Sequence, residues 1–258
     1  MRSLEHRYGD RVTVLDSPSL HAVLARLGEK RTGAATGAIL VREVYAALMV
    51  VAIDRHIRAR EVEVETRMAE ITPAGVWRGA VPDPATRVAI ACVLRAGLIP
   101  AQACLERFHG ILPPDNVRLD TLLMARITDE EGRVTGVDLS GSKIGGPVDG
   151  RVLLIPDPMG APGGTIVDTV RHYREHHGTP DQVLILTMIS TPEFLRRVLD
   201  EVPEAVIVTG RLDRGLSPPD VLACVPGERW DEEVGLTETS YIVPGAGGVG
   251  EVLTNSWV

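Results

Sequence analysis

The chain has 258 residues, of which 44% are hydrophobic and 24% charged, and this ordinary globular composition excludes a disordered chain. The formal net charge is −8, and no run of Lys or Arg forms the basic stripe that binding to a nucleic-acid backbone requires. The apolar run Ala46–Ile53 is too short to span a bilayer, and the N-terminus has no apolar signal segment. We therefore expect a cytoplasmic protein that binds neither nucleic acid nor membrane.

The predicted elements alternate along the chain. Apolar residues recur at helical spacing in Leu20–Leu27 and Ile39–Ile57, which predicts two N-terminal helices. Further along, short and nearly continuous apolar runs are typical of buried parallel strands. Four such strands are expected at Arg87–Leu94, Arg151–Ile155, Gln182–Met188 and Ala205–Thr209, with helices at Ile99–Phe108, Thr165–His177 and Pro192–Leu199. This alternation predicts an α/β protein with a doubly wound, mostly parallel sheet, as a single domain over residues 1–258.

One segment interrupts the alternation. Val117–Ile127 and Arg133–Leu139 flank the turn sequence Asp129–Gly132, and together they predict a β-hairpin over about residues 117–140. Placed over the ends of the strands, this hairpin would form a hood that covers a ligand.

The segment Arg151–Val167 places an aspartate and a glycine-rich turn between a strand and a helix. Ligands of open α/β sheets bind beyond the carboxyl ends of the strands. Gly163 and Gly164 let backbone N–H groups approach an anion, and the helix beginning near Thr165 adds its positive dipole end. Asp157 is placed to bind ribose hydroxyls or a magnesium ion held by a diphosphate. The turn predicts a phosphate site; the alternative is that the glycines only make a tight turn.

The sequence of this turn, DPMGAPGGT at Asp157–Thr165, resembles the phosphoribosyl pyrophosphate loop of uracil phosphoribosyltransferases, usually D-P-M-L-A-T-G-G-[ST]. Three further segments resemble motifs of that family, in the family's order. They are the pyrophosphate loop VLRAGL at Val93–Leu98, the hood strand MARITDEE at Met124–Glu131 and the uracil loop GLTETSYIVPGAGGVG at Gly235–Gly250. The resemblance extends over roughly residues 14–253.

The resemblance implies the type I phosphoribosyltransferase fold, with phosphoribosyl transfer from phosphoribosyl pyrophosphate to uracil or a related pyrimidine-like base. It also implies Mg²⁺ as cofactor, small-molecule substrates and a homo-oligomer, either a dimer or a tetramer. The catalytic residues that it implies are Arg95, Arg126 and Asp157. With these three, the residues that bind phosphoribosyl pyrophosphate are Pro158, Met159, Gly160, Ala161, Pro162, Gly163, Gly164 and Thr165. Main-chain groups of a loop over about residues 235–253 would bind the base, at Ile242, Gly247, Gly248 and Val249. No dedicated metal site in the protein is expected.

Two departures from the family pattern concern groups that would bind substrate. Pro162 replaces a threonine, which removes a hydroxyl and a backbone N–H from the phosphate loop. Gly248 replaces the aspartate of G-L-G-D-A-G, which touches the reacting end of phosphoribosyl pyrophosphate, and the loss is expected to cost roughly 1.5–3 kcal/mol. The segment Ser217–Val234 looks inserted ahead of the base loop. Its acidic end, Asp231 to Glu233, either returns a carboxylate to the site or is a solvated loop.

Two functions are therefore compared. Pro162 and Gly248 favour a non-catalytic sensor of a nucleotide or of phosphoribosyl pyrophosphate that keeps the fold. Arg95, Arg126 and Asp157 favour an enzyme, because a scaffold alone would not need converging charges. We predict an enzyme.

Overall fold

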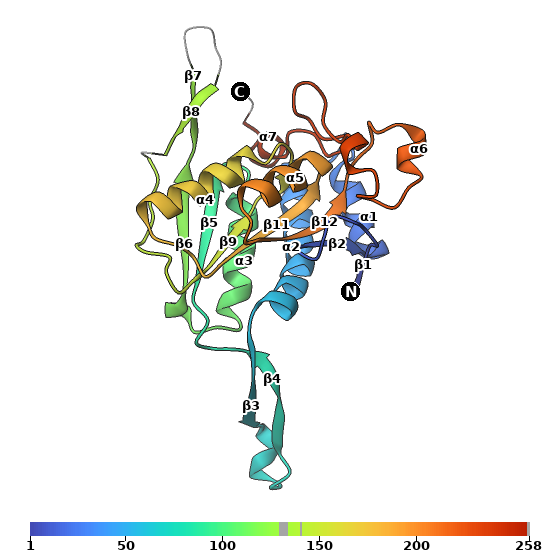
Figure 1. The fold of residues 1–258 in the computed structure, drawn as a ribbon. Coiled ribbons are helices and arrows are strands. Elements are labelled where there is room, and N and C mark those ends of the chain that lie inside the picture. Colours follow the sequence, from blue (N-terminus) through green and yellow to red (C-terminus); the bar gives the residue numbers. More distant parts are fainter. Residues whose placement is uncertain (129–133, 140, 257–258) are drawn as a thin grey trace.

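The computed structural model describes residues 1–128, 134–139 and 141–256, and a mostly parallel β-sheet forms its centre (Figure 1). Across the sheet, the strands follow the order β1 (Arg2–Ser3), β2 (Val12–Asp16), β12 (Ala205–Leu212), β11 (Gln182–Ser190), β9 (Val152–Pro156), β5 (Val88–Leu94) and β6 (Val117–Leu123), with β10 (Met159–Gly160) also beside β11. From β2 to β6 neighbouring strands are parallel, while β1 is antiparallel to β2. The predicted doubly wound, mostly parallel sheet is confirmed.

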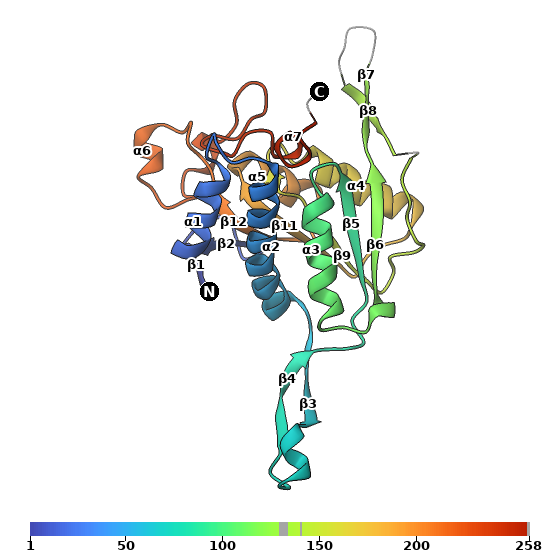
Figure 2. The ribbon, with the colours of Figure 1, turned by 180° about the vertical axis from the view of Figure 1, so that it is seen from behind.

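Helices cover both faces of this sheet (Figures 1 and 2). One layer holds α1 (Pro18–Leu27), α2 (Ala34–His56) and α3 (Leu98–His109), and the other holds α4 (Gly164–His176) and α5 (Pro192–Glu201). A buried apolar cluster lies on each face, because successive side chains of a strand point to opposite sides. On β9, Leu154 belongs to the first cluster, whereas Leu153 and Ile155 belong to the second. Burial on both faces explains why these strands are continuous apolar runs in the sequence.

Helix α2 extends well beyond the apolar run Ala46–Ile53, and by length and composition it is able to span a bilayer. Its side chains Val44, Tyr45 and Leu48 are nevertheless fully buried. The helix packs against α1, α3 and β11 (Figure 2). Its apolar residues therefore contribute to the protein core.

A two-stranded arm projects from the end of the sheet opposite to the C-terminal helix α7 (Val249–Thr254) (Figures 1 and 2). It pairs β3 (Ala59–Glu65) antiparallel with β4 (Val76–Pro82), and the 3-10 helix η1 (Arg67–Glu70) lies between them. Sequence analysis did not predict the arm. The reason is that AREVEVE, with a glutamate at every second position, lacks the continuous apolar run by which the other strands were recognised.

The predicted hairpin over residues 117–140 is wrong in its first half. Val117–Leu123 is β6, the parallel edge strand of the central sheet, which follows the 3-10 helix η2 (Pro114–Asn116). The hairpin itself consists of β7 (Ala125–Thr128) and β8 (Val134–Asp138), paired antiparallel. An edge strand has one neighbour and is less apolar than a central strand, so its sequence is easily taken for part of a hairpin. Residues 129–132, the predicted turn, lie outside the described residues.

The inserted segment Ser217–Val234 is an ordered cap, and it contains α6 (Pro219–Leu222) and the 3-10 helix η3 (Trp230–Glu232). Its centre is the carboxylate of Glu233, which is fully buried. Arg214 Nη1 lies 2.8 Å from Glu233 Oε1, and the Gly227 N–H donates to the same oxygen at 2.8 Å. The Tyr8 hydroxyl donates to the other oxygen, Oε2. The insertion is thus fixed to the N-terminal segment through Glu233. At its acidic end, Asp231 and Glu232 are exposed, as expected for a solvated loop, whereas Glu233 is buried.

Replacement of Arg214 by alanine should therefore destabilise the protein. The Glu233 carboxylate would stay buried without its countercharge, and we expect a loss of about 3 kcal/mol in the free energy of unfolding. Urea denaturation followed by circular dichroism measures it. The matched control is Arg78→Ala, which breaks the exposed Arg78–Glu63 pair of the arm and should cost less than about 1 kcal/mol. Equal losses in the two variants would contradict a structural role for the buried pair.

Candidate active site

Three segments that are distant in the sequence enclose one cavity of about 320 Å³. The first is the turn between β5 and α3, and the second is the loop between β9 and α4. The third is the C-terminal loop, residues 235–248, together with the start of α7. The cavity is lined by Arg95, Ala96, Met159, Ala161, Ser240, Tyr241, Ile242, Gly247, Gly248, Val249, Gly250 and Glu251. The three segments are those in which sequence analysis placed the phosphate, pyrophosphate and base motifs.

Arg95 is brought to the cavity by a tight turn at the end of β5. The turn requires glycine at position 97, because a Cβ there would lie 2.6 Å from the Val93 carbonyl oxygen. The Arg95 side chain is exposed, and its Nη1 donates to the Ser256 carbonyl oxygen at 3.0 Å. An exposed guanidinium at the mouth of a cavity is available to a phosphate or pyrophosphate group.

The phosphate loop, Asp157–Thr165, leads from β9 into α4. Gly163 is the N-cap and has φ +81°, a left-handed conformation that favours glycine. Helix α4 starts at Gly164, and the backbone N–H groups of Gly164 and Thr165 precede its first hydrogen bonds, which Ile166 and Val167 donate to the Gly163 carbonyl oxygen. Thr165 is exposed at this helix end. These features form a cradle for an anion.

Helix α5 supports the phosphate loop from behind. A Cβ at Gly160 would lie 2.8 Å from Ser190 Oγ and 3.0 Å from the ring of Phe194, so these two side chains fill the space next to the glycine that replaces the family's leucine. A Cβ at Gly164 would lie 3.1 Å from Nη1 of Arg197, whose Nε donates to Glu201 at 2.8 Å. The Arg197 guanidinium therefore lies beside the cradle, with its charge balanced by Glu201. The motifs gave no signal for Phe194 or Arg197, because both lie on another helix.

Asp157 lies where β9 ends, with Oδ1 accepting the Met159 N–H at 3.1 Å. Burial raises the pKa of this carboxyl to about 6, since desolvation disfavours its charged form, and the hydrogen bond from Met159 opposes that shift. At pH 7 the group is therefore mostly ionised, and it titrates about one pH unit below neutrality. A carboxyl with this property at a strand end is typical of a ligand site.

The C-terminal loop is fixed by a buried carboxylate that sequence analysis missed. Asp213 Oδ1 lies 2.6 Å from Arg211 Nε, and its Oδ2 accepts the Gly245 N–H at 2.7 Å. Arg211 Nη2 also donates to the Gly245 carbonyl oxygen at 3.1 Å. Gly245 and Gly247 have φ of +62° and +71°, which turn the chain back toward the cavity. The loop is therefore held by charged side chains that begin at the end of β12.

The predicted site residues are distributed as follows. Arg95, Met159, Ala161, Ile242, Gly247, Gly248 and Val249 line the cavity. Asp157, Pro158, Gly160, Pro162, Gly163, Gly164 and Thr165 belong to the adjoining phosphate loop and are not among the lining residues. Arg126 lies on β7 opposite Val137, and its side chain is outside the described part of the structure. Five further lining residues were not among the predicted site residues: Ala96, Ser240, Tyr241, Gly250 and Glu251.

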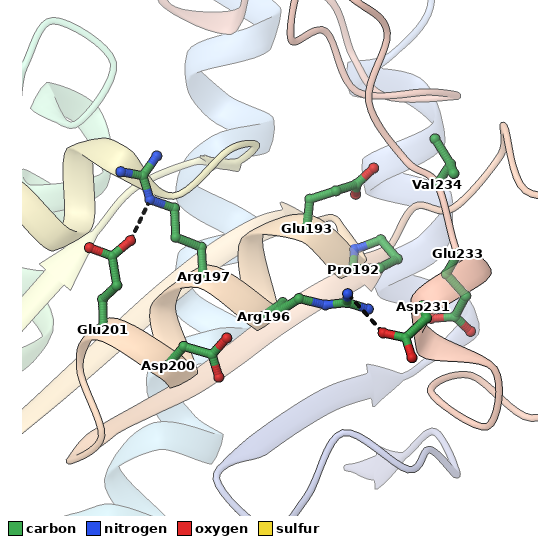
Figure 3. A pocket seen from close by; sticks show the side chains of 9 residues that line it. All are labelled: Pro192, Glu193, Arg196, Arg197, Asp200, Glu201, Asp231, Glu233 and Val234. Carbon is green, nitrogen blue, oxygen red and sulfur yellow. Dashed lines mark hydrogen bonds and ion pairs between the residues drawn. The ribbon is translucent and has the colours of Figure 1, made fainter.

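The acidic end of the insertion does not return a carboxylate to this cavity, so that alternative is wrong. Asp231 Oδ1 lies 2.9 Å from Nη1 of Arg196 on α5 (Figure 3). Glu232 pairs with Arg229, and Glu233 with Arg214. Asp231 and Glu233 line a separate and larger hollow of about 450 Å³ between α5 and the insertion (Figure 3).

The fold and these three loops define a phosphoribosyltransferase of the type I fold. A family model described as "Uracil phosphoribosyltransferase" matches residues 14–227, and the chain therefore belongs to the uracil phosphoribosyltransferase family.

Relatives and a solved structure are similar over nearly the whole chain. The uracil phosphoribosyltransferase of Campylobacter curvus is 27% identical over 95% of this chain and 98% of its own length. That of Dictyoglomus thermophilum is 28% identical over 94% of this chain and 98% of its own. A solved structure of a protein from Aquifex aeolicus has a TM-score of 0.69 at 23% identity, covering 96% of this chain and 99% of the other.

The raised pKa of Asp157 predicts how stability depends on pH in the absence of ligand. The folded protein holds this proton more tightly than the unfolded chain, so wild type should lose stability as pH rises from about 4 to about 6. Asp157→Asn removes this loss. At pH 8 the variant should be more stable than wild type by up to about 3 kcal/mol, with the difference vanishing near pH 4. Urea denaturation at the two pH values measures it, and a less stable variant at pH 8 would contradict the account.

Proposed function

We propose that the protein transfers a phosphoribosyl group from phosphoribosyl pyrophosphate to uracil or a related pyrimidine-like base. The observation that carries this proposal is the meeting of the arginine turn, the phosphate loop and the C-terminal loop around one cavity. Each loop offers a group that binds one part of the two substrates. The arginine turn offers a cation for pyrophosphate, the phosphate loop offers N–H groups for the 5′-phosphate, and the C-terminal loop offers main-chain groups for the base.

In this proposal the catalytic contribution of the protein is positioning and charge stabilisation. The base nitrogen forms a bond to C1′ of the ribose and releases its proton to solvent, while the bond from C1′ to pyrophosphate breaks and its electron pair leaves with pyrophosphate. Arg95 binds the leaving group as its charge develops. Asp157 binds the ribose hydroxyls, and Gly163–Thr165 hold the 5′-phosphate. Ile242, Gly247, Gly248 and Val249 present main-chain groups to the base.

The proposed cofactor is Mg²⁺ that enters with phosphoribosyl pyrophosphate. Among the described residues, no group of three or more His, Cys, Asp or Glu side chains is arranged to hold a metal ion. Magnesium in such sites is usually held by substrate phosphates and water with one or two carboxylates, and Asp157 at the phosphate loop is placed to be one of these carboxylates. The ion would neutralise charge on the diphosphate.

One assay tests both which base the protein accepts and whether it is an enzyme or a sensor. Purified protein is incubated with Mg²⁺, phosphoribosyl pyrophosphate and a panel of pyrimidine and purine bases, and release of pyrophosphate and formation of nucleotide are followed together. We expect turnover with uracil or a close analogue. Binding of phosphoribosyl pyrophosphate without turnover of any base would instead favour the sensor, for which the missing N–H at Pro162 is the structural argument.

Thr165→Ala should weaken binding of phosphoribosyl pyrophosphate. The side chain offers a hydroxyl at the start of α4, and loss of one hydrogen bond to a charged group raises Kd roughly tenfold or more. Isothermal calorimetry with Mg²⁺ present measures the change. Thr179→Ala is the control, since it makes the same change at an exposed turn that lies beyond the other end of α4. A Thr165→Ala Kd equal to that of the control would mean that the phosphate binds elsewhere.

We also propose that the arm binds a second copy of the chain, which gives the expected dimer or tetramer. The arm exposes large apolar side chains: Val64 is 47% exposed, Met68 50%, Ile71 76% and Trp77 46%. Light scattering should show an oligomer for wild type and a smaller species for the double variant Ile71→Ser, Trp77→Ser. The control Leu222→Ser, at an exposed residue of the insertion, should keep the wild-type mass. A monomeric wild type would overturn this proposal.

A further inference from the structure

The cavity contains a carboxylate that no motif predicted. Glu251 lies in the first turn of α7, and its side chain lines the cavity together with Arg95, Met159 and Gly248. The described position of its carboxyl group is specific: a Cβ added to Gly248 would overlap Glu251 Oε2 and lie 2.9 Å from Glu251 Cδ. The Glu251 carboxylate therefore occupies the space into which any side chain at position 248 would point.

This geometry explains the glycine at position 248. Residues three apart at the start of a helix lie on the same side, so the Glu251 side chain lies against Gly248. An aspartate at 248 would place its own carboxyl group about 1.5 Å beyond the Cβ, in the region that the Glu251 carboxylate already fills. Glycine at 248 thus leaves the room that the Glu251 carboxylate occupies, and a larger residue there would require the end of the Glu251 side chain to move. The space left by the family's aspartate is filled by the longer side chain one helical turn later.

We propose that Glu251 supplies the carboxylate that faces the reacting end of phosphoribosyl pyrophosphate in this protein. The proposal rests on the proposed function, because it concerns the same cavity. An ionised carboxylate there accepts hydrogen bonds from ribose hydroxyls or binds the magnesium ion that accompanies the diphosphate. It also stabilises the positive charge that develops on the sugar as the bond to pyrophosphate breaks. Arg95 and Glu251 line the same cavity, so Arg95 provides a positive charge for the leaving pyrophosphate and Glu251 a negative charge for the ribose.

A structural role for Glu251 is the competing explanation, since an acidic residue in the first turn of a helix interacts favourably with the helix dipole. The two roles differ in what relocation of the carboxylate should do. A helix-stabilising glutamate affects the melting temperature without ligand and leaves kcat/KM of the folded protein unchanged. At position 248, the N-cap of α7, an aspartate would also stabilise the helix, so only kcat/KM and the stabilisation by ligand separate the two roles. If the Glu251 carboxylate acts on the substrate, an aspartate at position 248 should restore kcat/KM, provided that the Glu251 side chain has been removed.

The experiment compares Glu251→Gln, Glu251→Ala, Gly248→Asp and the double variant Gly248→Asp, Glu251→Ala. Glu175→Gln, at an exposed residue of α4, is the control. For each protein we measure kcat/KM for phosphoribosyl pyrophosphate with the base that wild type accepts, and the thermal stabilisation that Mg²⁺ and phosphoribosyl pyrophosphate produce. Melting curves without ligand show whether each variant folds.

We expect kcat/KM to fall about 10- to 150-fold in both single variants of Glu251, as loss of one charge-assisted hydrogen bond predicts. Gly248→Asp alone should not raise activity, because two carboxylates would compete for one space. The double variant should recover most of the loss seen in Glu251→Ala. The stabilisation by Mg²⁺ and phosphoribosyl pyrophosphate should follow the same order.

Two results would overturn the inference, and they are distinguishable from failure of the proposed function. If wild type is active and both Glu251 variants keep its kcat/KM, Glu251 is not the carboxylate. If Gly248→Asp alone raises activity tenfold, the carboxylate was missing and Glu251 does not supply it. If wild type is neither stabilised by phosphoribosyl pyrophosphate with Mg²⁺ nor active with any base, the proposed function fails, and this inference fails with it.

Discussion

The carboxyl ends of parallel strands meet at one edge of the sheet, and the whole candidate site depends on that constraint. β9 pairs with β5 on one side and with β11 on the other, so the arginine turn and the phosphate loop leave the sheet as neighbours. The C-terminal loop belongs to no strand of the sheet. It reaches the same edge because Arg211 and Asp213, at the end of β12, bind the backbone of Gly245. Sheet pairing and one buried ion pair thus build the cavity.

Two departures from the family pattern, at Gly160 and Gly248, have a common physical explanation: a side chain from another position occupies the space beside the glycine. Gly160 has lost a side chain, and the Phe194 ring packs against it. Gly248 has lost a carboxylate, and Glu251 extends over it. In both cases the atoms beside the glycine come from a residue outside the motif, so a position-by-position comparison of the motif with the family pattern does not reveal them. Pro162 is different, because a missing backbone N–H cannot be restored by a side-chain exchange at another position.

The layers of the fold were predictable because buried strands are continuous apolar runs, as in Gln182–Met188, whose alternating side chains reach two cores. The arm was not predictable in this way, since exposure on both faces leaves AREVEVE without an apolar run. Local motifs located the cavity, because the glycines of a phosphate loop are adjacent in sequence. Phe194 and Asp213 could not be found, since their contacts with the loops depend on packing between segments far apart in the chain.

The most direct measurement of the central claim is a crystal structure of the protein with Mg²⁺ and phosphoribosyl pyrophosphate. The account predicts the 5′-phosphate on the N–H groups of Gly163–Thr165, the pyrophosphate at Arg95, and a Glu251 carboxylate oxygen within hydrogen-bonding distance of the ribose or bound to the magnesium ion. A ligand bound in the hollow beside α5, or a Glu251 side chain directed away from the bound ribose, would contradict it.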